Sequence, residues 1–487
     1  MKVPEGFEKY HPGNVVLLLL RTIYGLKQAA VQYWKEMQKA FQHMQYERSK
    51  ADPCLYYKWQ VDPKDLKKKL VIWLLWVDDS LITGPVEAVS HAKQKMMSLF
   101  DCDDLGEMKE YVGCKVERNW KEQWIKLTQP VLLQSFKDEF PLDTHRPNPR
   151  TPAEVGDNLS KGESHEQLNQ KDQKKYRSGV GKLLHMMHWT RPEILNRVRE
   201  LSRFMSGATQ KHMAAMTRVM KYCVSMAKRG LFLNPDGIWD GTKDFIFKIK
   251  GKSDSEYGKD ESRKSVNGWA VWLCLAAVVF RSKMMPIIAL SVTEAELFAA
   301  TQCAQDMLFV MRILNSLGLK VELPMILEID NRGAVDITNN WAIGGRTRHV
   351  EVKQYFLWEL KEMGLIVCKW CNGAKMTSDL FTKNLAGPLF DKHAQSFVGH
   401  DEYMKQRGDV EWIEEVHHGT HKGRVLESNC ESHMDSNLVM EPDRNNDKTE
   451  VTTVVETCQV MVDGGGRAGE TIYNWEYLRV WNTMLEE

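Results

Sequence analysis

The stretch DFIFKIKGKSDSEYG, residues 244–258, decides the fold of the second half of this chain. Apolar and polar residues alternate in it before it turns acidic, and this pattern predicts a strand that ends near Asp254. A second apolar run, MILEIDN at 325–331, predicts a strand that ends at Asp330. Together with the helical patterns around them, these runs predict a mixed sheet with flanking helices over residues 245–390.

Two further acids fall in elements that can bring them to the same edge of this sheet. Glu296 lies near the start of a predicted amphipathic helix, 293–318, and Asp379 opens a short helical stretch in MTSDLFTK. With Asp254 and Asp330 they form a set of four carboxylates. Such a set can hold two Mg²⁺ (or Mn²⁺) ions about 4 Å apart around a phosphodiester. Each acid alone could equally cap a helix or lie on a solvated face.

The rest of the chain divides into four segments of different composition. Residues 1–140 have a mixed α/β pattern, and residues 141–175 form a polar linker rich in Pro and Gly. Helical spacing dominates 176–232, and the tail 401–487 is acidic, polar and predicted to be largely disordered. Pro- and Gly-rich linkers precede residues 245–390, whose predicted strands and helices form a closed α/β unit with an apolar core, so we expect residues 240–400 to fold without residues 1–230. The predicted class is a multidomain α/β and α+β chain.

In the first segment, two patterns stand out. The run VVLLLL at 15–20 predicts a buried strand, and its six residues are too few to span a bilayer. The stretch KKKLVIWLLWVDDSLITG at 67–84 predicts a hairpin with Asp78 and Asp79 at its tip.

Charge is unevenly distributed along the 487 residues, although the formal net charge is only +1. Residues 401–487 carry 8 Lys and Arg against 19 Asp and Glu, a net charge of −11, so residues 1–400 carry +12. A cationic body suits a nucleic acid, because bound phosphates release counterions. The ten cysteines have no regular spacing, which favours a reducing compartment, cytoplasmic or nuclear, over secretion. We expect no membrane partner.

Six short sequences between residues 245 and 390 occur in the order found in one known domain. They are SDSEYG, SRKSVNGWAVWL, ALSVTEAEL, EIDNRGAV, GGRTRHVEVKQYF and SDLFTKNL. This part resembles the RNase H domain that closes the polyprotein of copia-type LTR retrotransposons. The resemblance implies that Asp254, Glu296, Asp330 and Asp379 are catalytic metal ligands. It also favours Glu296 over its neighbour Glu294, because AELFAA resembles the small-x-Glu-Leu pattern of RNase H helices.

The first segment resembles the reverse transcriptase of the same family in YGLKQAA, WVDD and YVGCKVERN. This resemblance implies a polymerase palm in 1–140 followed by a helical thumb or connection in 176–232, with Asp78 and Asp79 as the catalytic pair. The opening MKVPEGFEKY resembles the segment that follows the family's first catalytic Asp. We therefore expect the polymerase activity to be lost by truncation.

The resemblance also assigns residues to contacts with nucleic acid. The cationic and polar side chains expected to contact it are Arg21, Lys27, Gln28, Arg263, Lys264, Lys283, Arg346 and Arg348. The sequence thus predicts an RNase H that uses Mg²⁺ or Mn²⁺ to cleave the RNA strand of an RNA–DNA hybrid. Hybrid or template RNA is the expected partner, and self-association is a further hypothesis. The alternative is an inactive remnant that only binds nucleic acid.

Overall fold

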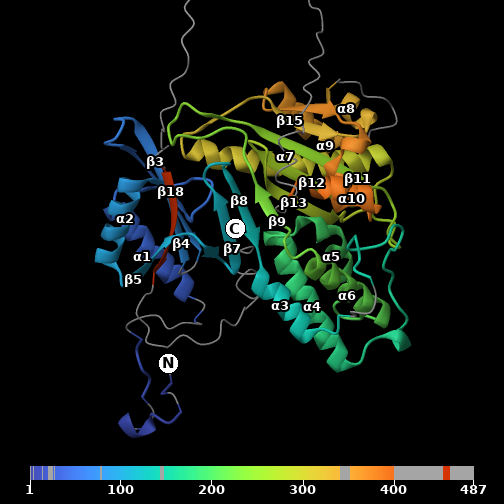
Figure 1. Ribbon diagram of the computed structural model, residues 1–487, viewed down its shortest axis with the longest axis horizontal. Coiled ribbons are helices and arrows are strands. Elements are labelled where there is room, and N and C mark those ends of the chain that lie inside the picture. Colours follow the sequence, from blue (N-terminus) through green and yellow to red (C-terminus); the bar gives the residue numbers. More distant parts are fainter. Residues whose placement is uncertain are drawn as a thin grey trace, which may run out of the picture.

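The computed structural model describes the backbone of residues 2–3, 5–11, 13, 15–19, 26, 28–76, 79–142, 147–339, 351–399 and 453–460. These residues form a mixed α/β protein with three larger sheets and several groups of helices (Figure 1). Burial of apolar side chains along the strands and apolar stripes along the helices account for the layers.

The first sheet, in the part resembling the polymerase, has the strand order β1-β2-β3-β4-β18-β5. Its strands are β1 (Glu47–Arg48), β2 (Leu55–Val61), β3 (Lys68–Trp76), β4 (Asp79–Pro85), β5 (Cys102–Glu107) and β18 (Thr453–Val460). Helices α1 (Ala29–His43) and α2 (Val86–Leu99) supply apolar side chains to one core with this sheet, where Phe41 stacks on Tyr56. The 3-10 turn η1 (Glu8–Tyr10) precedes them.

Strand β18 comes from the acidic tail and lies between β4 and β5 (Figure 1). It is antiparallel to both strands, so β4, α2 and β5 form a β-α-β unit whose two strands are parallel and are separated by one position. By pairing with both strands, β18 supplies hydrogen-bond partners for the backbone groups of β4 and β5 that face each other. Without β18 these two strand edges would be unpaired. The sequence did not reveal this strand.

The second sheet joins the first segment to the helical part. Its order is β17-β9-β8-β7-β6, and its strands are β6 (Glu110–Tyr111), β7 (Cys114–Asn119), β8 (Trp124–Thr128), β9 (Gly230–Leu233) and β17 (Val398–Gly399). The helical elements nearby are α3 (Pro130–Glu139), η2 (Ser164–Glu166), α4 (Gln170–Trp189), η3 (Pro192–Ile194), α5 (Leu195–Ser202) and α6 (Gln210–Ser225). The helix α4 begins inside the expected linker, where the Asn169 side chain accepts a hydrogen bond from the Asp172 N–H.

The third sheet is the mixed sheet expected from the stretch at 244–258. Its order is β13-β12-β11-β15-β16, with β11 (Ile249–Glu256), β12 (Val266–Leu273), β13 (Ala276–Met284), β15 (Met325–Ile329) and β16 (Ile366–Trp370). The hairpin strands β11, β12 and β13 are antiparallel, whereas β11, β15 and β16 are parallel. A small parallel pair, β10 (Ile246–Phe247) with β14 (Lys320–Val321), lies beside it.

Helices cover both faces of the third sheet. On one face lies α7 (Val292–Ser316), whose residues Ala300, Cys303 and Met307 are fully buried, together with α8 (Arg332–Asn339) and α9 (Glu351–Glu362). By length and apolar composition α7 could span a membrane, but here it is a core helix. The other face meets α5 and the short elements η5 (Gly373–Lys375), η6 (Thr377–Phe381) and α10 (Gly387–Ala394).

One hydrophobic core extends from the helical part to the third sheet. Leu183, Val198 and Met216 from the helices share it with Trp272 of β12 and Phe381 of η6. Burial in a common core stabilises by roughly 25 cal/mol per Å² of apolar surface. In the intact chain the helical part covers this surface, and the expectation that residues 240–400 fold by themselves stays a prediction.

Two other sequence expectations have different outcomes. The hairpin of β3 and β4 is present as expected. The buried strand expected at 15–20 is wrong: Val16 and Leu18 are 78% and 85% exposed, and Val16 makes only an isolated bridge with Lys2. Within the described residues no sheet covers the run at 15–19, so its apolar side chains are not buried as expected.

The position of β18 predicts that the tail stabilises the first sheet. A chain that ends at Thr452 lacks β18, whereas a chain that ends at Asp463 keeps it. We expect the amides of β4 and β5 to exchange with deuterium on the order of tenfold faster in the shorter chain, because their ladder partners are removed. Hydrogen exchange with mass spectrometry measures this. Equal exchange in both chains would contradict the pairing.

Candidate metal centre

Three carboxylates meet at the carboxyl ends of two parallel strands. Asp254 lies near the end of β11 and Asp330 directly follows β15, and the pairing of Ser253 with Ile329 sets the two acids side by side. Glu296 reaches them from α7, which packs on β11. One ligand oxygen from each acid lies within 4.8 Å of the others. Such a set of carboxylate oxygens suits a hard cation such as Mg²⁺.

Burial makes negative charge costly at this position. Asp254 and Glu296 are 1% and 3% exposed. Glu296 Oε1 accepts a hydrogen bond from the Ser255 N–H at 3.3 Å, but Glu296 Oε2 is buried with no partner. Burial, and then the charges of Asp254 and Asp330, raise the pKa of Glu296 well above its ordinary value. A bound divalent cation would satisfy the unpaired oxygen and offset the repulsion, so these residues fit the ion that the sequence suggested.

The neighbouring Glu294 has a different role. Its Oε2 accepts a hydrogen bond from the Leu290 N–H at 2.7 Å, while its own N–H donates to Ser291 Oγ at 3.1 Å. Glu294 thus closes the start of α7 as a capping residue. The structure therefore groups Glu296, and not Glu294, with the other acids.

Asp379 is connected to the three acids by Lys383, which forms ion pairs with both Asp379 and Asp254. Lys383 Nζ lies 2.7 Å from Asp379 Oδ1 and 3.1 Å from Asp254 Oδ1. Burial, and then the charge of Asp254, raise the pKa of Asp379 to about 7, although Lys383 opposes this shift. Asp330 also has a raised pKa, from burial and then from Asp254. The four predicted acids are therefore neighbours, and a cationic side chain lies between two of them.

Sequence reasoning missed Lys383 and the adjacent Thr382. Thr382 Oγ1 donates a short hydrogen bond to Asp254 Oδ2. The available signal was the spacing of Asp379 and Lys383, since an acid and a lysine four residues apart in a helical turn commonly pair. Nothing in the local pattern indicates that the same lysine would also contact Asp254.

A second group of charges supports the strands behind the site. Glu328 Oε1 and Oε2 pair with Lys250 at 2.6 Å and with Lys252 at 3.1 Å. Burial would raise the pKa of Glu328, but the two lysines lower it overall. Lys252 Nζ also donates to the Lys375 carbonyl oxygen at 2.9 Å and so fixes the segment before Asp379.

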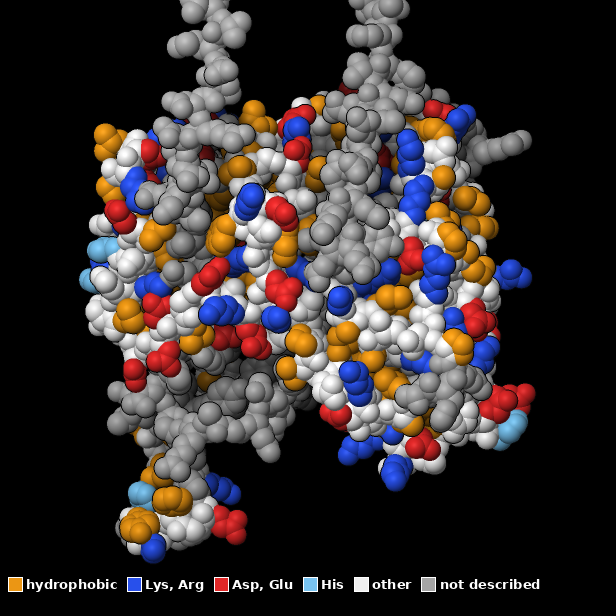
Figure 2. Space-filling model, viewed as in Figure 1, with side chains coloured by type: hydrophobic (Ala, Val, Ile, Leu, Met, Phe, Trp, Pro, Cys, Tyr) orange, Lys and Arg blue, Asp and Glu red, His pale blue; other side chains and the backbone are white. Residues whose placement is uncertain are grey.

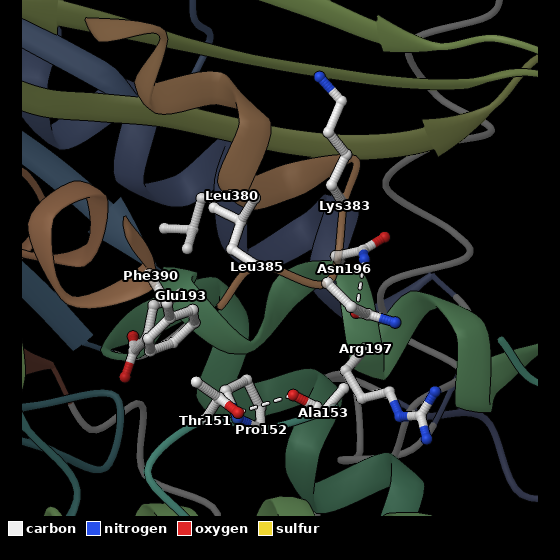
Figure 3. Close-up of a pocket in the computed structure, with 11 residues that line it drawn as sticks. Thr151, Pro152, Ala153, Glu193, Asn196, Arg197, Leu380, Lys383, Leu385 and Phe390 are labelled. Atoms are coloured by element: carbon white, nitrogen blue, oxygen red, sulfur yellow. Dashed lines mark hydrogen bonds between the residues drawn. The ribbon is translucent and has the colours of Figure 1, made fainter. Parts of the chain in front are cut away.

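A small cavity lies next to the segment that carries Lys383. Its lining comes from three parts of the chain and comprises Thr151, Pro152, Ala153, Glu193, Asn196, Arg197, Leu380, Lys383, Asn384, Leu385 and Phe390. The cavity has room for about one water molecule and not for a substrate. Figure 3 shows the Lys383 side chain pointing away from this cavity, toward the strands of the sheet.

Of the expected polymerase pair, Asp79 lies in the first sheet, apart from this centre. Asp79 begins β4 and pairs with Trp76 across the hairpin and with Gln459 of β18. Asp78 lies outside the described residues. Among the residues that the structure describes, Asp79 belongs to no group of three potential metal ligands.

Four of the eight residues expected to contact nucleic acid can be located. Gln28 precedes α1 and is exposed, as are Arg263 and Lys283, while Lys264 is half-buried. Arg263 and Lys264 lie in the turn between β11 and β12, and Lys283 lies on β13 over the Trp269 ring at 5.7 Å. The remaining expected contacts lie outside the described residues: Arg21, Lys27, Arg346 and Arg348. Figure 2 shows Lys and Arg side chains mixed with Asp and Glu on the described part of its face.

Comparison with known proteins finds relatives that are similar to most of the chain. Residues 1–152 match the family model described as reverse transcriptase (RNA-dependent DNA polymerase). The chain is 30% identical over 365 residues to the retrovirus-related Pol polyprotein from transposon TNT 1-94 of Nicotiana tabacum, covering 74% of this chain and 26% of that protein. It is 25% identical over 396 residues to the Pol polyprotein from transposon RE1 of Arabidopsis thaliana, covering 81% and 26%.

Among solved structures, the N-terminal RNase H domain of rv2228c from Mycobacterium tuberculosis, fused to maltose-binding protein, matches 31% of this chain and 97% of that chain. The sequence identity is 15% and the TM-score is 0.21.

The first segment thus matches the reverse transcriptase class. Over most of its length the chain is similar to retrovirus-related Pol polyproteins of plant transposons, which confirms the resemblance to a retrotransposon Pol polyprotein seen in its sequence. It spans about a quarter of the length of these relatives.

The raised pKa of Asp379 predicts a pH-dependent stability difference. An acid with a higher pKa in the folded state destabilises the fold increasingly as pH rises from its unfolded pKa to its folded pKa, here from about 4 to about 7. Asp379→Asn has no such titration. Melting temperatures of both proteins are compared without divalent ions. We expect the variant to gain a few degrees relative to the wild type as the pH rises from about 5 to about 8, because only the wild type is destabilised by ionisation of Asp379.

The exposed Asp336 on α8 supplies the control. Asp336→Asn should differ from the wild type by a constant amount over the same pH range. Parallel curves for all three proteins would show that the environment of Asp379 does not raise its pKa.

Proposed function

We propose that this chain hydrolyses the RNA strand of RNA–DNA hybrids in a reaction that depends on Mg²⁺ or Mn²⁺. One observation supports this most strongly: Asp254, Glu296 and Asp330 converge within 4.8 Å, and a buried Glu296 oxygen has no partner. The strand order β13-β12-β11-β15-β16 gives the mixed sheet that the RNase H resemblance implies. The family match to reverse transcriptases makes nucleic acid the natural substrate class.

The division of roles follows from the distances. Glu296 and Asp330 would hold one ion together with Asp254, and Asp379 would hold a second ion together with Asp254. Bound ions of this kind lower the pKa of water and stabilise the leaving oxygen. The acids themselves do not attack the phosphodiester. Because the four carboxylates are buried or half-buried and fixed by the backbone, their charges are oriented before the reaction starts. The protein therefore does not have to reorganise them during the reaction.

A chain that binds hybrids without cleaving them is the second candidate. Lys383 favours it, because its ammonium already compensates two of the four acids without a metal ion. The two candidates differ in turnover and not in affinity, so binding measurements alone do not separate them.

Substitution of Asp330 tests the proposed reaction. Asp330→Asn keeps the shape of the side chain and removes the charge that would hold an ion. We expect hybrid cleavage in magnesium to fall at least about 100-fold, the loss expected for a principal electrostatic contribution. Folding should survive or improve, because one source of repulsion is removed. Cleavage assays paired with thermal melts in EDTA measure both effects.

Asp336→Asn, six residues further along the chain, is the matched control and should leave cleavage nearly unchanged. A wild-type chain that binds hybrids but never cleaves them would favour the second candidate. An Asp330→Asn variant as active as the wild type would place the active site elsewhere.

For the first sheet we expect no template-dependent primer extension. Among the described residues Asp79 belongs to no group of three potential metal ligands, and two-metal polymerisation requires several carboxylates around the ions. A primer-extension assay with an RNA template checks this. Synthesis that disappears when Asp78 and Asp79 are both replaced by Asn would show that a polymerase site forms after all.

A further inference from the structure

Lys383 divides the acidic centre into two unequal edges. One edge comprises Asp254 and Asp379, and the lysine ammonium lies between their Oδ1 atoms at 3.1 and 2.7 Å. The other edge comprises Asp254, Glu296 and Asp330, whose ligand oxygens lie within 4.8 Å of one another. Among the described contacts, Lys383 forms ion pairs only at the first edge.

The ammonium is a strong partner for its two acids. The Lys383 ammonium forms ion pairs with Asp254 and with Asp379, so it is the counter-ion of two carboxylates at once. Opposite charges about 3 Å apart at a partly buried site attract strongly, whereas exposed pairs contribute little. The Lys383 side chain is 32% exposed, which leaves the ammonium a route to solvent.

The backbone around Lys383 is anchored on both sides. Its own N–H donates to the Asp379 carbonyl at 2.9 Å, and the preceding Thr382 hydroxyl donates to Asp254. The following Asn384 accepts a hydrogen bond from Asn196 Nδ2 at 3.0 Å and donates one to the Asp157 carbonyl at 3.1 Å. These contacts tie the segment to the helical part. The ammonium can therefore leave only by rotation of its own flexible side chain.

We propose that Lys383 competes with the second metal ion and so makes the two edges load in order. The Asp254–Glu296–Asp330 edge binds a divalent ion while Lys383 remains in place. The Asp254–Asp379 edge binds an ion only after the ammonium has left it. This inference rests on the proposed metal centre and assigns Lys383 as a positioning residue within it.

A nucleic acid offers the displaced ammonium a new partner. Lysine binds phosphate as a compact point charge, and Lys383 lies beside the position proposed for the phosphodiester. Binding of the hybrid would then draw the ammonium from Asp254 and Asp379 and favour the second ion. Loading of that ion is thereby coupled to the substrate.

Titration of the intact chain with Mn²⁺, followed by calorimetry and by the electron paramagnetic resonance signal of free Mn²⁺, tests the order of loading. We expect the wild type to bind one ion tightly and a second one weakly. Lys383→Met should tighten the second site at least about tenfold and change the first less than about threefold. Lys383→Gln provides the same test with a polar side chain if the Met variant folds poorly.

Two controls separate competition from a general loss of positive charge. Lys383→Arg keeps a cation at this position and should retain the weak second site. Lys259→Met removes a lysine that pairs with Glu256 at 2.5 Å, outside the four acids, and should behave as the wild type. In EDTA, Lys383→Met should melt below the wild type, because Asp254 and Asp379 lose their counter-ion, and Mn²⁺ should restore its stability more than it does for the wild type.

The outcomes distinguish this inference from the proposed function. One tight ion in every protein, with an unchanged or weaker second site in Lys383→Met, would overturn the competition and leave the metal centre intact. Absence of any bound ion in the wild type and in the variants would overturn both. A second site that tightens equally in Lys259→Met would also overturn the specific role of Lys383.

Discussion

The repulsion among carboxylates at the edge shared by β11 and β15 is the constraint on which the second half of this chain depends. Parallel pairing sets Asp254 beside Asp330, and α7 adds Glu296 from one face of the sheet. Burial removes the water that would screen these charges. A cation must therefore compensate them, and the protein supplies one of its own in Lys383.

The helical part contributes to this balance without contributing an acid. Its core continues into the third sheet, and Asn196 holds the segment in which Lys383 lies. A site built on such a rigid support keeps its charged groups in place before any substrate binds. The helices thus act as part of the site's framework, although the linkers around them suggested a separate unit.

Local pattern was sufficient for much of the fold. The two apolar runs on either side of an acidic turn in KKKLVIWLLWVDDSLITG predicted the hairpin of β3 and β4, because one face of these strands is buried under α1 and α2. The same reasoning failed for the apolar run VVLLLL, whose residues have no covering layer within the described residues. The strand β18 was missed for another reason. Its partners lie more than 340 positions away in the chain, and an acidic, polar context conceals a short strand.

The sequence by itself determined the similarity to Pol polyproteins, the hairpins, the helix α7 and the choice of four candidate acids, since periodicity and short motifs are local properties. Only the tertiary structure decided which acids share an edge, that Glu294 caps a helix while Glu296 joins the group, and that Lys383 contacts Asp254. Lys383 and Asp254 are 129 positions apart. Their contact depends on the packing of β11, η6 and the helical part together, and no local pattern encodes such a distance.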